Sequence, residues 1–122
     1  MIEVICDTNF LIHLATRRIK NIDNLGVEIG QIIFIVPQVV KNELFELSKN
    51  PNKTQEIKST LNYIKKFKTI PILGTFADKE LLDYVADNKT IVATMDRELK
   101  KKIKKHGSSI MSFSNNKIIL ES

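Results

Sequence analysis

The sequence predicts an α/β fold, a three-layer α/β/α sandwich with a mostly parallel central sheet. Short continuous apolar runs such as Ile2–Cys6 and Ile32–Val36 are typical of strands buried on both faces. Amphipathic segments separate these runs, and strands that alternate with helices indicate a parallel sheet. The length of 122 residues suits one domain, so residues 1–122 are predicted to form a single unit.

The first half of the chain is expected to contain two strands and two helices. In order, these are a strand over 2–6, a helix from 8 to 17 or 18, a connector over 21–30 with about one helical turn, a strand over 32–36 and a helix reaching about 49. Pro37 suits the first turn of the second helix, because its ring already holds a helical φ. Asn50-Pro51-Asn52 then ends that helix.

The second half repeats the alternation. The expected elements are a helix over 54–67, a short strand over 69–73, a helix over 78–87, a strand over 90–94, a helix over 96–106 and two strands over 109–113 and 117–120. Gly74 closes the short strand and Gly107 stops the last helix. Ser114-Asn115-Asn116 is the predicted turn between the last two strands.

One acid of the helix after Pro37 lies in the wrong place for a solvated face. Glu43 follows Val40 by three residues and precedes Leu47 by four, so a rotation of about 100° per residue places it within the apolar stripe. A buried carboxylate is costly unless a base, a hydrogen-bond donor or a metal ion pairs with it. Glu43 therefore needs a partner.

Three aspartates show the same phase. Asp7, Asp78 and Asp96 each precede apolar residues of a helix in register with them, and Asp7 and Asp96 directly follow strands. Ligands of open α/β sheets bind at the carboxyl ends of strands, and divalent cations relieve the repulsion of clustered acids. However, Asp is also a favoured helix N-cap, and Glu43 alone can pair with a lysine or arginine. The residues by themselves leave both readings open.

Charge and cysteine content restrict the partners and the compartment. The net charge of +5 suits a polyanionic substrate, although a basic chain is also simply soluble. The single cysteine, Cys6, cannot form an internal disulfide and fits a core thiol in a reducing cytosol. No apolar run approaches the ~18 residues of a membrane span, and the N-terminus lacks signal-peptide features. A cytoplasmic protein without a membrane partner is expected.

Four segments together resemble PIN domains. They are Asp7-Thr8-Asn9-Phe10-Leu11 after a strand, Val36-Pro37 through Glu43-Leu44, Ala77-Asp78 before a helix, and Thr94-Met95-Asp96 with the basic residues that follow. The resemblance covers nearly the whole chain. Within the family, Gly74–Asp78, the basic run after Asp96 and Ser114-Asn115 are most similar to the branch of the eukaryotic small-subunit-processome nuclease and its archaeal VapC-like relatives.

This resemblance implies a metal-dependent endoribonuclease that acts in rRNA maturation or as a VapC-like toxin. The catalytic and metal-binding set would be Asp7, Glu43, Asp78 and Asp96, which would hold one or two Mg²⁺ or Mn²⁺ ions. Thr8, Asn9 and Thr94 would orient carboxylates or the scissile phosphate, or act only as helix caps. The implied partners are RNA, an antitoxin or a pre-ribosome, and a second copy in a homodimer, for which the outward-facing Phe45 is a candidate contact.

A basic run follows Asp96 on the last predicted helix. Arg97, Lys100, Lys101 and Lys104 are the residues expected to bind RNA. Such a run is often only a solvated helix face, but its position one residue after a candidate ligand suits phosphates that approach the site.

Lys79 is a departure from the branch, which often has a second acid at this position. It favours an alternative function, an RNA-binding or ribosome-assembly factor with weak or no cleavage. Two other α/β classes fit less well. Receiver domains need paired acids after the first strand, where only Asp7 is present, and haloacid-dehalogenase-type phosphatases need Asp-x-Asp, where Asn9 replaces the second acid.

Overall fold

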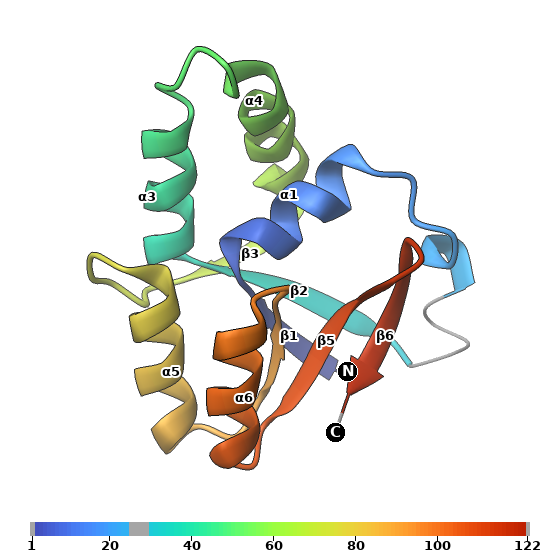
Figure 1. Cartoon of the computed structure of the whole chain (residues 1–122), viewed down its shortest axis with the longest axis vertical. Helices are drawn as coiled ribbons and strands as arrows, with labels where there is room; N and C mark the ends of the chain where they lie inside the picture. Colours follow the sequence, from blue (N-terminus) through green and yellow to red (C-terminus); the bar gives the residue numbers. More distant parts are fainter. Residues whose placement is uncertain (1, 25–29, 122) are drawn as a thin grey trace.

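The computed structural model describes residues 2–24 and 30–121, and these residues build one six-stranded sheet (Figure 1). The strands are β1 Ile2–Cys6, β2 Ile32–Pro37, β3 Lys68–Ile70, β4 Ile91–Ala93, β5 Ser109–Ser114 and β6 Lys117–Glu121. Their order is β3-β2-β1-β4-β5-β6, and all neighbours are parallel except β5 and β6. The predicted mostly parallel sheet is confirmed.

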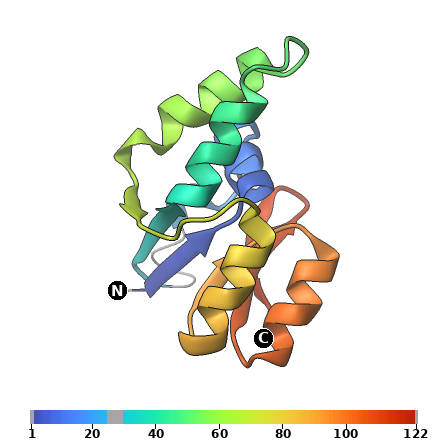
Figure 2. The same cartoon turned by 90° about the vertical axis from the view of Figure 1, so that its left-hand side faces the viewer.

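Helices cover both faces of the sheet, which confirms the three-layer arrangement (Figures 1 and 2). One layer contains α1 Thr8–Thr16, α3 Gln38–Leu47 and α4 Thr54–Tyr63, and the other contains α5 Ala77–Asp87 and α6 Arg97–Lys105. Two short 3₁₀ turns, η1 Ile22–Asn24 and η2 Ile64–Lys66, complete the described elements. None of the described helices is long and apolar enough to cross a membrane.

The two-residue period of the strands divides the core into two clusters. Val4 and Cys6 of β1 pack with Phe10 and Leu44 on the α1–α3–α4 side. Ile5, between them, packs on the α5–α6 side instead. Strands buried on both faces account for the continuous apolar runs in the sequence. Cys6 is a buried free thiol, as predicted, and burial raises its pKa.

Two predicted boundaries in the middle of the chain are wrong. The expected strand 69–73 ends at Ile70, because Pro71 has no N–H for the ladder and the N–H of Ile72 donates to the carbonyl of Ile70 (2.9 Å). The expected helix 54–67 ends at Tyr63 and tightens into the η2 turn. Because β3 ends at Ile70, earlier than predicted, residues 71–76 form an irregular segment that leads into α5.

The predicted connector over 21–30 contains the helical turn η1, while its residues 25–29 lie outside the described part of the structure. The Asn21 side chain exchanges two hydrogen bonds with the backbone of Ile118, at 3.0 and 2.9 Å. At the predicted β5–β6 turn, Asn115 and Asn116 have φ values of 53° and 59°. These values match a two-residue type I′ hairpin turn.

The N-terminal ends of α1, α3, α5 and α6 gather at one edge of the sheet (Figure 1). This edge is where the parallel strands β1, β2 and β4 end. The topology therefore brings segments that are far apart in the sequence to the place where α/β sheets bind ligands.

Candidate carboxylate site at the sheet edge

Asp7 lies directly after β1 and is held by the neighbouring strand. Its backbone N–H donates to the carbonyl of Ala93 (2.8 Å), and the hydroxyl of Thr94 donates to its Oδ2 (2.9 Å). Its Oδ1 accepts from the backbone N–H of Thr8 (2.8 Å), so Asp7 caps α1. Both carboxylate oxygens are thus oriented by the end of β4 and the start of α1.

Asp7 is only 7% exposed, and the pKa of its carboxyl group is raised. Burial is the largest cause, because it penalises the charged form. Hydrogen bonds from Thr8 and Thr94 act in the opposite direction, while the charges of Glu43 and Asp96 raise the pKa further. A carboxylate in this environment is stabilised by a cation, and such perturbed groups are common at functional sites.

Asp96 caps α6 and shares a hydroxyl with Asp7. Its Oδ1 accepts from the N–H groups of Glu98 (2.9 Å) and Leu99 (3.2 Å). Its own N–H donates to Thr94 Oγ1 (3.1 Å), the same oxygen that donates to Asp7. Thr94 is fully buried and therefore fixes the spacing between the two acids.

The helix-borne acids lie at the two sides of this pair. Glu43 of α3 is half-buried and borders a hollow of about 440 Å³ next to Phe76. Asp78, in the first turn of α5, is exposed and lines a pocket of about 170 Å³ together with Asp96. The expectation that all four acids face the core holds only in part. Asp78 and Asp96 are exposed, because each stands at the start of a helix and not within its buried stripe.

The structure therefore places Glu43 and Asp96 near enough to Asp7 for their charges to raise its pKa, and it places Asp78 with Asp96 in a common pocket. Among the described residues, no three His, Cys, Asp or Glu side chains are already arranged to hold a metal ion. Mg²⁺ usually binds through one or two carboxylates and keeps several waters, so a preformed three-ligand cage is not required.

Of the two polar residues that begin α1, only one faces the interior. Thr8 is buried, and its Oγ1 has no hydrogen-bond partner within the described structure. An unsatisfied buried hydroxyl beside Asp7 is unusual and suits a ligand or an ordered water there. Asn9 is exposed.

The predicted RNA-binding residues divide into two pairs. Lys100 and Lys104 contact the carboxylate of Glu121 on β6, at 3.1 and 3.3 Å. Arg97 and Lys101 are exposed. Two other lysines, Lys79 and Lys102, line the pocket that contains Asp78 and Asp96. The sequence does not identify them as RNA-binding residues, because helical periodicity shows a single basic run after Asp96 and does not show that Lys79 lies near it.

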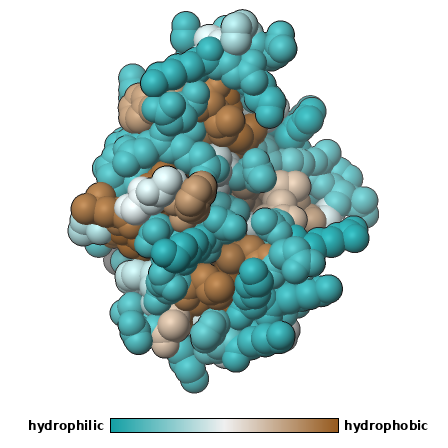
Figure 3. Space-filling model, turned by 60° about the vertical axis from the view of Figure 1, so that its left-hand side comes forward, coloured by the Kyte–Doolittle hydropathy of each residue, from teal (hydrophilic) through white to brown (hydrophobic). Residues whose placement is uncertain are grey.

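Apolar side chains are also exposed near the acids. Leu73 and Phe76 lie in the segment before α5, and Met95 precedes Asp96. The face in Figure 3 carries several separate hydrophobic patches on a mainly hydrophilic surface.

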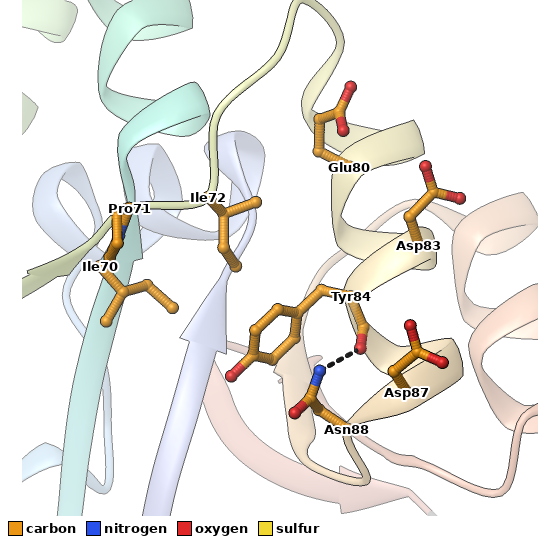
Figure 4. A pocket seen from close by; sticks show the side chains of 8 residues that line it. All are labelled: Ile70, Pro71, Ile72, Glu80, Asp83, Tyr84, Asp87 and Asn88. Atoms are coloured by element: carbon orange, nitrogen blue, oxygen red, sulfur yellow. Dashed lines mark hydrogen bonds between the residues drawn. The ribbon is translucent and has the colours of Figure 1, made fainter.

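Another hollow, of about 530 Å³, lies between the segment 70–72 and α5. Ile70, Ile72 and Tyr84 provide apolar lining, and Glu80, Asp83 and Asp87 provide negative charge (Figure 4). Asn88 turns back to the carbonyl of Tyr84 (2.9 Å). Its acidic lining, without a base, is unsuited to a nucleic acid, which distinguishes it from the pocket beside Asp96.

Comparisons with known proteins agree with this architecture. Ribonuclease VapC4 from Methanocaldococcus jannaschii is 30% identical over 121 residues, covering 91% of this chain and 89% of that protein. The solved structure of the PIN domain endonuclease Utp24 is 31% identical, with a TM-score of 0.81 over 98% of this chain and 90% of that one. A domain of a functionally unknown protein from M. jannaschii shares the fold at 15% identity (TM-score 0.60, covering 93% and 92% of the two chains). A family model described as a PIN like domain matches residues 4–115, and the chain therefore belongs to the PIN-like domain family.

Proposed function

We propose that this protein is a metal-dependent endoribonuclease that hydrolyses phosphodiester bonds in RNA. The observation that carries the proposal is Asp7, a buried carboxylate whose pKa is raised by burial and by the charges of Glu43 and Asp96. A group in this state gains most from a bound cation. The two relatives that are named as a ribonuclease and an endonuclease support nuclease activity.

The donor set fits Mg²⁺ or Mn²⁺. Every candidate ligand is a carboxylate oxygen, which hard divalent cations prefer, and the unpartnered Thr8 hydroxyl adds a polar group beside Asp7. Asp7, Glu43 and Asp96 would bind from one side and Asp78 from the side of α5, directly or through water. Such an ion would supply a polarised water as the nucleophile and would neutralise charge that develops on the phosphate.

The protein's own groups then have separate tasks. Thr94 holds Asp7 and Asp96 in a fixed relation through one hydroxyl oxygen. Arg97, at the start of α6, and Lys101, in its middle, are exposed and would contact the RNA backbone as it approaches. No side-chain nucleophile is needed, because the attacking group is water.

The test is cleavage of labelled single-stranded RNA with Mn²⁺, with EDTA, and by Asp7→Asn. We expect cleavage by the wild type that needs the metal ion and is lost in the variant. Equal cleavage by the wild type and Asp7→Asn would refute the proposed site. Cleavage that persists in EDTA would refute metal dependence.

The alternative is an RNA-binding or ribosome-assembly factor with weak or no cleavage. Lys79 favours it, because a base stands beside Asp78 where the resembled branch often has an acid. Tight RNA binding without cleavage in Mn²⁺ would support this alternative, and gain of cleavage in Lys79→Asp would confirm the cause.

For the biological role we propose cytoplasmic rRNA maturation or action as a VapC-like toxin, with a pre-ribosome or an antitoxin as the respective partner. Pull-down from cells with a catalytically inactive variant distinguishes the two by what it retains. A homodimer is also proposed, with the exposed Phe45 of α3 as a candidate contact. Sedimentation that shows only monomer at high concentration would rule the dimer out.

A further inference from the structure

The pocket of about 170 Å³ beside Asp78 contains charges of both signs. It lies between α5 and α6, which run side by side in Figures 1 and 2. Leu82 and Leu99 are its apolar lining. Its charged residues are Asp78, Asp96 and Glu98 together with Lys79 and Lys102. Two of the proposed metal ligands thus share one small pocket with two ammonium groups.

These opposite charges do not neutralise one another. Within the described residues, neither Lys79 nor Lys102 has a carboxylate within 4.0 Å of its ammonium group. Lys100 and Lys104, on the adjacent face of α6, differ because both are paired with Glu121. The lysines of the pocket therefore keep their charge available for a ligand.

The three acids of this pocket outnumber its two lysines, so a phosphate can bind there only when a cation offsets the acids. Asp96 caps α6 through two hydrogen bonds, whereas Phe76, the residue before α5, offers no side-chain cap. The first N–H groups of α5 carry partial positive charge, and two acids of the same turn, Asp78 and Glu80, already offset part of it. A ligand that satisfies all of these groups combines a divalent cation for the acids with phosphate oxygens for the lysines.

We propose that Lys79 and Lys102 bind the non-bridging oxygens of an RNA phosphate in this pocket, next to the bond that is cut. The proposal rests on the nuclease function proposed above. It gives Lys79 a role as a substrate contact, so that the absence of an acid at this position is not a defect. Lys79 is placed to reach the phosphate from α5 and Lys102 from α6, so the two helices would hold the RNA backbone between them.

The test measures binding of a labelled single-stranded RNA with Ca²⁺ in place of Mn²⁺, so that a hard cation can occupy the carboxylates, and a gel of the same samples checks that the probe is intact. The variants are Lys79→Gln and Lys102→Gln. The control, Lys58→Gln, removes the same charge from an exposed position on α4, in the other helical layer. Each pocket variant should reduce the slope of log affinity against log salt by about 0.7, and bind about fivefold more weakly at 0.1 M salt. The control should keep the wild-type slope, and Lys79→Arg should largely restore binding.

Equal slopes for both pocket variants and the control would overturn the proposal, as would a wild type that does not bind RNA. The experiment, combined with the cleavage assay, also distinguishes failure of this proposal from failure of the proposed nuclease function. Metal-dependent cleavage with unchanged slopes would reject the lysine contacts and leave the proposed function intact. Reduced slopes without any cleavage would support the contacts and reject the nuclease.

Discussion

Two carboxylates of this protein have opposite surroundings. Glu121 on β6 accepts hydrogen bonds from Ser112, Lys100 and Lys104, and these lower its pKa to about 2. Asp7 is buried beside Glu43 and Asp96, and its pKa is raised. The folded chain thus stabilises the charge of Glu121 and opposes the charge of Asp7.

The difference suits a structural role for Glu121 and the metal-binding role that we propose for Asp7. Glu121 already has its cations, because Lys100 and Lys104 fill that role, and it ties α6 to the last strand. Asp7 has oriented oxygens, but no basic side chain of the described residues forms an ion pair with it, so a bound cation or protonation would relieve its repulsion with Glu43 and Asp96. Strain of this kind at one site, offset by a well-packed fold elsewhere, is typical of functional positions.

The largest expected effect is on activity at Asp7. Asp7→Asn keeps the shape of the side chain but removes its charge, so cleavage should fall by at least about 100-fold. Stability at pH 7 should rise or stay the same, because the buried charge and its repulsion are gone. Cleavage rates and urea unfolding of the same preparation measure both. A loss of stability together with activity would mean that Asp7 is mainly structural.

The next effect is stabilisation by metal. A cation that binds only the folded state adds about 2.7 kcal/mol to the free energy of unfolding at 100 times its dissociation constant. Urea unfolding of the wild type with increasing Mn²⁺ should therefore shift to higher denaturant. The shift should be absent in Asp7→Asn and retained in Glu121→Gln. An equal shift in all three proteins would place the ion elsewhere.

Glu121→Gln should lower stability by about 1 kcal/mol at pH 7, since the side chain is 28% exposed and solvent screens its two pairs. The folded-state pKa lies below the ordinary value, so this stabilisation is complete above about pH 4.5. It is lost as the pH falls toward 2. The difference in the free energy of unfolding between wild type and Glu121→Gln should therefore disappear as the pH falls from about 4.5 to 2. Glu46→Gln is the control, because the Glu46–Lys49 pair is largely exposed and its loss should have little effect.

The pH dependence of the free energy of unfolding should have the opposite sign for Asp7. Its raised pKa means that ionised Asp7 destabilises the fold, and protonation at low pH relieves this cost. The stability advantage of Asp7→Asn should therefore be largest near neutral pH and should disappear as the pH falls below the ordinary pKa of 3.8. An advantage that grows on acidification would contradict the assigned direction.

Much of this arrangement could be predicted from local patterns. The apolar runs gave the strands, and the position of Asp7 and Asp96 after two of them gave the edge of the sheet where they meet. Pro71 could also have ended β3 at Ile70, because a residue without an N–H interrupts a strand. These inferences need only neighbouring residues.

Contacts between distant segments could not be predicted in this way. The ion pairs of Lys100 and Lys104 with Glu121 depend on the β5–β6 hairpin, which places residue 121 beside α6. Helical periodicity alone showed one basic run. The approach of Lys79 to Lys102 depends likewise on how α5 packs against α6, so the pocket between them had no local signal.

Asp96 combines a capping role with a place in the proposed site, and the smallest expected effect is the difference in stability between two of its variants. Its Oδ1 caps α6 through Glu98 and Leu99, while its charge raises the pKa of Asp7. Asn is also a good cap and Ala is not, so Asp96→Ala should be about 1 kcal/mol less stable than Asp96→Asn in urea unfolding. Both variants should lose cleavage, because neither has a carboxylate for the cation. If Asp96→Asn still cleaves RNA like the wild type, then Asp96 is a helix cap only, and the site consists of the remaining acids.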